Sequence, residues 1–401
     1  MLNWQMAERE STEHLISKVV NSVVFFEEFV FAKNKFKSAP GMELELADAV
    51  VALDDVLLVM QIKERSDGSA NTPEIEQKWF QRKVVGVATR QIRDTLRYLV
   101  EHNEIKLANE YGRIFDLAAG RYSEIIRFVL YQASDNLPES CRLKKFHRSA
   151  EGGFIHILDV EDYLKIAQLL RVPEDIIRYF RYRELMLTKF ESECASLPEA
   201  SLAGGYIGDG DDKPPQFESF SNLHRMVFDD ETWDISRHLR TLRDHTSDPK
   251  YHDDYYEIMR EFVRLPRSMW RVFKERFDLC IKNAQEDKFA LPYRGAFPER
   301  SIGFMLFSPD SGYTKRDDWG KNRIKGLINF TSLQKFDQKL EKCIGVQIAK
   351  DGQEFDIQWC MITGEWVDDP DLKAKLEVSS PFRPVSEKQQ FSYFLHDQQQ
   401  I

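Results

Sequence analysis

The chain has 401 residues, of which 42% are apolar and 30% charged, and its formal net charge is −10 at pH 7. This composition is typical of a folded protein of about two domains and excludes a disordered or fibrous chain. The net negative charge argues against a protein that coats nucleic acid nonspecifically, because phosphate binding relies on clustered lysine and arginine. Any contact with nucleic acid therefore has to come from a local basic strip.

The sequence also bears on the cellular compartment. No apolar run approaches the roughly 18 residues that a membrane span needs, and the chain begins with MLNWQMAERESTEH, which lacks the basic-then-apolar order of a signal peptide. We therefore expect a cytoplasmic protein with no membrane contact. The cysteines are widely spaced and contain no CxxC pair, which favours reduced core thiols over disulfides or a zinc knuckle.

The N-terminal part of the chain shows a helix followed by a β-hairpin. Apolar residues recur at helical spacing over residues 11–24, which predicts the first helix. Two β-rich runs follow at about 44–53 and 56–63, and Asp54 and Asp55 stand between them. A hairpin that turns at these two aspartates is the simplest interpretation.

A long helix is predicted next, from Thr72 to about His102, because apolar residues recur at spacings of three to five and no proline interrupts its interior. Short strand-like runs follow at 104–108, 113–118, 124–130 and 152–158. The alternation of helix, hairpin, helix and strands indicates an α/β fold.

A change of composition suggests where the chain divides. Residues 197–221 gather Gly, Asp and Pro with little apolar periodicity, which we interpret as a linker or a long surface loop. The pattern then predicts helices to about residue 285 and α/β elements to the end. The expected organisation is an N-terminal domain at 1–196 and a C-terminal α+β domain at 222–401, to which no motif assigns a role.

Three polar residues stand out in the apolar hairpin. Gln61 and Lys63 follow the run VLLVM and share one face of the strand, because side chains alternate along a strand. Asp48 lies in the adjoining strand, and the hairpin turn brings it across from them. A buried lysine without a partner costs roughly several kcal/mol, so we expect the three side chains to compensate one another at one end of the sheet. A purely structural polar cluster is the alternative.

An acid, an amide oxygen and an ammonium at the end of one sheet are a suitable set for phosphodiester hydrolysis. Asp48, the Gln61 side-chain oxygen and the Ile62 backbone carbonyl supply oxygen ligands for Mg²⁺ or Mn²⁺. The metal would activate water and neutralise phosphate charge, and Lys63 would position the nucleophile or stabilise the transition state.

Asp48 followed by Gln61-Ile62-Lys63 resembles the D…(D/E/Q)xK signature of the PD-(D/E)XK nuclease superfamily, and the order helix, hairpin, long helix, strand resembles its core. The resemblance covers roughly residues 11–160. It implies a restriction-endonuclease-like αβββαβ core and Mg²⁺-dependent cleavage of DNA, with restriction or defence as common roles. Gln61 stands where Glu or Asp is more common, which removes one charge from the ligand set.

The resemblance also implies an acidic residue from the first helix. Glu13 is the preferred candidate because it lies on the same side as Ile16 and Val20, and Glu27 is the alternative if the helix continues. A solvated acid in the first helical turn is the plain interpretation of Glu13.

The long helix carries a predicted basic face. At about 100° per residue, six basic side chains fall on the side opposite to the apolar residues. They are Lys78, Arg82, Lys83, Arg90, Arg93 and Arg97. We interpret this face as a track for DNA phosphates, and a solvated amphipathic surface is the alternative.

Two functions from different classes follow from these patterns. The leading hypothesis is a metal-dependent DNA endonuclease whose C-terminal domain serves target choice or homodimer formation. The alternative is a catalytically degenerate protein that keeps the nuclease fold for binding or assembly. The two differ in one feature, since an intact metal site needs a second carboxylate near Asp48.

Overall fold

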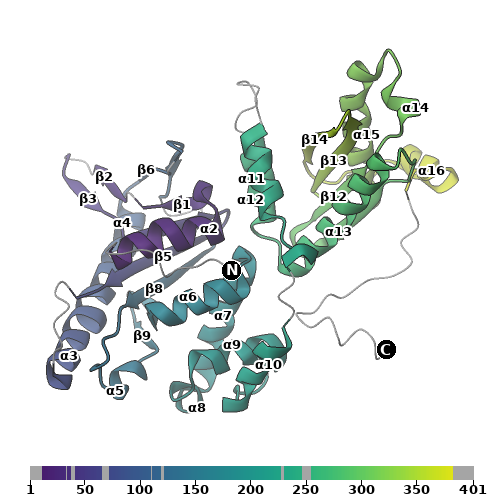
Figure 1. Cartoon of the computed structure of the whole chain (residues 1–401). Helices are drawn as coiled ribbons and strands as arrows, with labels where there is room; N and C mark the ends of the chain where they lie inside the picture. The colour runs from purple at the N-terminus through teal and green to yellow at the C-terminus, as the bar shows by residue number, and fades with distance from the viewer. Residues whose placement is uncertain are drawn as a thin grey trace. The chain divides into compact units, whose positions relative to one another are not determined.

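The computed structural model describes residues 11–32, 34–37, 41–65, 72–109, 111–118, 122–226, 230–245 and 254–382. The chain divides into two units, Met1–Met226 and Val227–Ile401. Each unit combines helices with a mixed β-sheet, so the α/β class expected from the sequence is confirmed (Figure 1). No helix in the described part of the chain is both long and apolar enough to pass through a bilayer.

The centre of the first unit is a six-stranded sheet with the order β1-β4-β5-β8-β10-β9. Its strands are β1 (Val30–Phe31), β4 (Ala49–Leu53), β5 (Val56–Lys63), β8 (Glu124–Tyr131), β9 (Phe146–Ser149) and β10 (Gly153–Asp159). The pairs β1/β4, β4/β5 and β9/β10 are antiparallel, whereas β5, β8 and β10 run parallel. The carboxyl ends of these three parallel strands therefore meet at one edge, where Lys63, Tyr131 and Asp159 form one row.

The predicted hairpin is confirmed by strands β4 and β5, which pair from Ala49–Met60 to Leu53–Val56. Asp54 has a φ of 52°, the left-handed conformation that tight hairpin turns require and that aspartate tolerates better than most residues. Every residue of β4 and nearly every residue of β5 is buried. The strands of the hairpin thus lie in the core of the unit, and only its ends, at Lys63 and at the Asp54-Asp55 turn, are partly exposed.

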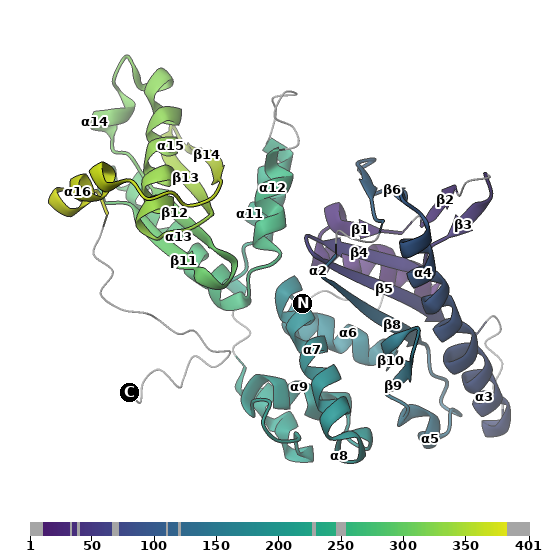
Figure 2. The same cartoon turned by 180° about the vertical axis from the view of Figure 1, so that it is seen from behind.

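The predicted long helix is also confirmed, as the continuous series α3 (Pro73–Trp79), η4 (Phe80–Ala88, π-helical) and α4 (Thr89–Glu101). Pro73 begins it, in the position where a missing N–H is harmless. Phe80, Val84 and Ile92 pack in one core cluster with sheet residues such as Val59 and Val129. Because Leu57 and Val59 of this cluster point to the same side of β5 as Gln61 and Lys63, the helix covers the face on which these two residues lie. Figure 2 shows α3 and α4 beside the sheet from behind.

The opposite face of the sheet is covered by α1 (Thr12–His14), η2 (Leu15–Val20), α2 (Asn21–Phe25), α6 (Val160–Leu170) and α7 (Pro173–Lys189). Phe128, which points to this side, makes edge contacts with the rings of Tyr163 and Phe180. The Asn21 amide donates a hydrogen bond to the sulfur of Met60 at 3.4 Å. Four smaller strands form two separate ribbons, β2 (Lys35–Lys37) with β3 (Glu43–Glu45) and β6 (Lys106–Ala108) with β7 (Ile114–Asp116).

The expectation of a linker at 197–221 is wrong, and that of a surface loop is confirmed only for residues 209–216, which have no helix or strand and are largely exposed. The segment contains α9 (Glu199–Gly208) and the short η5 (Phe217–Phe220), and it precedes α10 (Ser221–Arg225) within the first unit. Residues 201–205 are all buried. A Cβ added at Gly204 would lie 2.0 Å from the Ser219 carbonyl oxygen, so the glycines serve close packing of backbone rather than a flexible loop.

The second unit is built on a four-stranded sheet with the order β11-β12-β13-β14. Its strands are β11 (Tyr293–Phe297), β12 (Ile302–Phe307), β13 (Lys342–Asp351) and β14 (Glu354–Thr363). Its helical elements are η6 (Asp230–Thr232), α11 (Ser236–His245), α12 (Asp254–Phe262), α13 (Arg267–Gln285), η7 (Pro298–Arg300), α14 (Ser311–Thr314), α15 (Trp319–Asp337) and α16 (Pro370–Val378). Phe273 and Phe277 of α13 stack on Trp359, while Thr331 of α15 contacts Cys360. Helices α13 and α15 thus cover opposite faces of this sheet.

Candidate functional site

The structure brings Asp48, Gln61 and Lys63 together at the carboxyl end of β5. The Lys63 ammonium nitrogen lies 3.0 Å from Asp48 Oδ2, 3.3 Å from Gln61 Oε1 and 3.0 Å from the Ile62 carbonyl oxygen. Gln61 and Lys63 share a face because they are two residues apart on the strand. Asp48 reaches them because it directly precedes β4 in the hairpin.

The Asp48 carboxylate is held in place by the backbone as well. The β4–β5 ladder ends at the pair Ala49–Met60. Just beyond that pair, Asp48 Oδ2 accepts the Ile62 N–H at 2.6 Å and so satisfies a donor that the ladder leaves over. One carboxylate oxygen therefore serves both the strand and the lysine.

The group is sheltered but open to solvent. The side chains of Asp48 and Lys63 are 13% and 15% exposed, and Gln61 is buried. An ion pair in such a place is screened less by water and salt than a surface pair. The remaining exposure leaves part of both charged side chains in contact with solvent.

Three oxygen atoms surround the Lys63 ammonium at hydrogen-bond distances. The three atoms that the sequence suggests as metal ligands all converge on one point, and a cationic nitrogen takes that point here. Oxygen ligands of this kind suit Mg²⁺ and Mn²⁺. This set of possible ligands consists of one carboxylate, one side-chain amide and one backbone carbonyl. A cluster of three or more His, Cys, Asp or Glu side chains that could hold a metal is not present among the described residues.

Glu13 lies within electrostatic reach of this group. Burial raises the pKa of its carboxyl, the Asp48 and Glu45 carboxylates raise it further, and the Lys63 ammonium acts in the opposite direction. The helix that carries it begins at Thr12, with Ser11 as the N-cap. The structure thus places a second carboxylate in the neighbourhood of Asp48, on a side chain that is itself exposed.

The carboxyl end of β5 is held against the neighbouring helices by two contacts, neither of which was predicted from the sequence. The Thr12 N–H donates to Glu64 Oε2 at 2.7 Å, which ties the start of the first helix to the strand. Arg65 forms an ion pair with the buried Glu76 of α3. The strand end is therefore fixed to both helical layers that flank it.

Only some of the basic side chains predicted on the long helix are free of ion pairs within the described part of the chain and so able to bind phosphate. Lys78, Arg82, Lys83 and Arg90 are exposed. Two other members of the set are already paired. Arg93 lies 3.2 Å from Glu151, and Arg97 contacts Asp94 and Glu101 at 3.0 and 3.7 Å. The exposed positive charge therefore concentrates on residues 78–90.

No family model matches this chain, and neither the curated proteins nor the solved structures that were searched contain a match to it.

Proposed function

We propose that the first unit is a metal-dependent nuclease that hydrolyses phosphodiester bonds in DNA, with Asp48, Gln61 and Lys63 as its reactive centre. One observation carries the proposal. The three oxygen atoms of Asp48, Gln61 and Ile62 converge on the Lys63 ammonium at the open end of a buried hairpin.

The residues divide the chemistry among them. Asp48, Gln61 and the Ile62 carbonyl would hold Mg²⁺ or Mn²⁺, and the bound metal would supply Lewis-acid chemistry toward water and phosphate. Lys63, on a flexible four-carbon stem, would turn its ammonium from these oxygens to the phosphate and stabilise the charge of the transition state. Glu13, whose pKa is raised, would accept a proton from the attacking water.

The order of the elements supports a restriction-endonuclease-like core. The helical segment 12–25 precedes the antiparallel strands β1, β4 and β5. After the β6–β7 ribbon, the long helix is followed by β8, which is parallel to β5. This order supports the αβββαβ core that the resemblance implies, with the β2–β3 ribbon inserted after β1 and the β6–β7 ribbon inserted before β8.

DNA is the proposed substrate because the exposed basic residues lie on the helix that covers the face of Gln61 and Lys63. Arg82, Lys83 and Arg90 have no carboxylate within ion-pairing distance among the described residues. Such side chains bind phosphates without sequence preference and position a duplex.

The test is cleavage of supercoiled plasmid and linear duplex DNA by the full chain, with Mg²⁺ or Mn²⁺ and with EDTA. Asp48→Asn and Lys63→Met are compared with the native protein, and Asp212→Asn and Lys189→Met are exposed control variants with the same changes of side chain. We expect metal-dependent cutting that falls at least about 100-fold in both site variants and is retained in both controls.

Two outcomes contradict the proposal. Cutting that is unchanged in Asp48→Asn would place the activity elsewhere in the chain. If the native protein does not cut and its metal binding, measured by calorimetry, is the same in Asp48→Asn, the enzyme hypothesis fails, and DNA binding that persists would favour the degenerate binding protein.

A further inference from the structure

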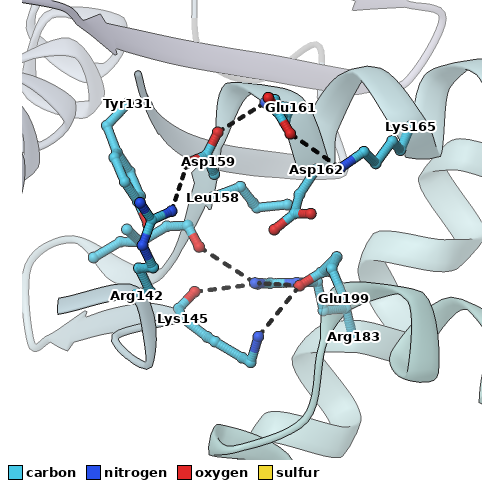
Figure 3. A pocket seen from close by; sticks show the side chains of 11 residues that line it. Tyr131, Arg142, Lys145, Leu158, Asp159, Glu161, Asp162, Lys165, Arg183 and Glu199 are labelled. Carbon is cyan, nitrogen blue, oxygen red and sulfur yellow. Dashed lines mark hydrogen bonds and ion pairs between the residues drawn. The ribbon is translucent and has the colours of Figure 1, made fainter. Parts of the chain in front are cut away.

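A second polar site lies at the same edge of the sheet. A cavity of about 260 Å³ opens beside the carboxyl ends of β8 and β10. Tyr131, which is the register neighbour of Lys63, lies on one side of it together with Arg142, and Lys145, the end of β10 and side chains from α6, α7 and α9 complete the lining (Figure 3). All of its lining residues belong to the first unit.

The cavity is lined by as many basic as acidic side chains. The basic ones are Arg142, Lys145, Lys165 and Arg183, and the acidic ones are Asp159, Glu161, Asp162 and Glu199. A neutral balance of this kind does not favour a phosphate or another polyanion, and charged walls do not favour an apolar ligand. The volume is below the roughly 300 to 1,000 Å³ of pockets for drug-sized ligands, so the ligand is small.

Most of these charges are already compensated. Arg183 and Glu199 form a fully buried pair, with Nε–Oε1 at 2.6 Å and Nη2–Oε2 at 3.2 Å. Arg142 lies 3.6 Å from Asp159, and Lys165 lies 3.1 Å from Glu161. Burial opposes the ionisation of Glu199, but Arg183 and Lys145 lower its pKa to about 2, so this carboxylate stays charged.

Three groups at the cavity remain open to a ligand. Asp162 projects toward the open centre of Figure 3, and within the described ranges it has no hydrogen bond or ion pair. The nearly buried Lys145 ammonium lies 3.7 Å from Glu199 Oε2, which is longer than a hydrogen bond, and both Glu199 oxygens already accept from Arg183. The Tyr131 hydroxyl likewise makes no hydrogen bond with the described residues.

We infer that this cavity binds a small zwitterion, an α-amino acid or a close analogue of one. The ligand ammonium contacts the Asp162 carboxylate, and the ligand carboxylate faces the Lys145 ammonium and the Tyr131 hydroxyl. A molecule with one charge of each sign keeps the cavity neutral, gives Asp162 and Tyr131 a partner, and gives Lys145 a second partner beside Glu199. The inference goes beyond the proposed nuclease activity and does not rest on it, since neither Asp48 nor Lys63 lines the cavity.

The experiment is isothermal titration of the full chain at pH 8 with each of the twenty protein L-amino acids in turn. For the best binder, the N-acetyl derivative and the carboxamide are titrated into the native protein, so that each charge of the ligand is removed without any substitution. Inorganic phosphate and a nucleoside monophosphate are the probes for anion and nucleotide binding.

We expect at least one amino acid to bind with a Kd below about 1 mM, and either derivative to bind at least about tenfold more weakly. Asp162→Asn weakens binding by a similar factor, whereas Glu139→Gln, an exposed acid on α5 (Glu139–Arg142), and Asp48→Asn do not. Unchanged binding in Asp48→Asn separates this site from the nuclease centre.

The inference is overturned if no amino acid binds, or if the N-acetyl derivative binds as well as the parent. Binding of phosphate or the nucleotide, with no binding of amino acids, would assign the cavity to an anion instead.

Discussion

Lys63 Nζ lies 3.0 Å from Asp48 Oδ2, and the same oxygen accepts the Ile62 N–H at 2.6 Å. The carboxylate thus closes the end of the β4–β5 ladder and neutralises the lysine at once. Replacing Asp48 by asparagine keeps an oxygen that can accept the Ile62 N–H but removes the negative charge that neutralises Lys63, whereas replacing it by alanine removes both. Comparing the two substitutions therefore separates the effect of the hydrogen bond from the effect of the charge.

Asp48→Ala should destabilise the β5 strand by about 2 to 4 kcal/mol, because it leaves the Ile62 N–H without an acceptor and the sheltered lysine without its counter-charge. Asp48→Asn should cost only about 1 to 2 kcal/mol, since the amide oxygen still accepts the N–H. Hydrogen exchange of the peptide that covers β5, measured in the full chain, reports both values.

Glu43→Gln is the matched control for this prediction. Glu43 lies 3.9 Å from Lys35 in a pair whose side chains are more than 60% exposed. Its loss should change stability by less than about 0.5 kcal/mol. Equal, small effects at residues 43 and 48 would show that Asp48 has no anchoring role.

Gln61→Glu should strengthen the binding of Mn²⁺ by roughly tenfold, because it adds a second full negative charge to the proposed ligand set. Cleavage of DNA should rise with metal affinity if the metal limits the reaction. Calorimetric titration with Mn²⁺ measures the first effect, and the exposed Gln77→Glu is the control. Affinity that stays the same in Gln61→Glu would mean that Gln61 is not a ligand.

Double substitution of Arg82 and Lys83 by glutamine should weaken DNA binding and reduce the slope of log K against log salt by about 2, one unit for each lost phosphate contact. Both side chains are exposed. Arg97→Gln should change the slope little, since Arg97 is already paired with Asp94 and Glu101. Fluorescence anisotropy with EDTA present measures binding without cleavage. A slope that is unchanged in the double variant would remove residues 82 and 83 from the proposed DNA track.

The elements that follow a clear period could be predicted from the sequence. The two β-rich runs and the Asp54-Asp55 turn between them correctly predicted the hairpin, and from it the meeting of Asp48 with Lys63. The period of the long helix was equally clear, but its pattern could not show that Arg93 is paired with Glu151, a residue far along the chain.

Other features depend on contacts that no local pattern records. The glycines of α9 have the composition of a loop, yet they are there because Gly204 packs directly against backbone at Ser219. The cavity at Asp162 combines residues of β8, β10 and helices α5, α6, α7 and α9 that come together only when these helices pack on the sheet. The spacing of these residues along the sequence therefore could not predict the cavity.

Asp162 should make the native protein less stable as the pH rises. Burial raises its pKa to about 6, and the Glu199 and Asp159 carboxylates contribute in the same direction. A carboxyl group with a raised pKa favours the folded state while it is protonated. Its contribution is therefore fully present below the unfolded pKa, near 3.8, and is lost as the pH rises through about 6.

Asp162→Asn removes this titration. The variant should match the native protein near pH 3.5 and exceed it at pH 8 by on the order of 2 kcal/mol, seen as a higher midpoint of thermal unfolding. The same substitution should weaken amino-acid binding. Stability would then rise while affinity falls, which is expected when a residue needed for function lowers the stability of the folded protein. A variant whose midpoint follows that of the native protein from pH 3.5 to 8 would show that the Asp162 carboxylate carries no such penalty.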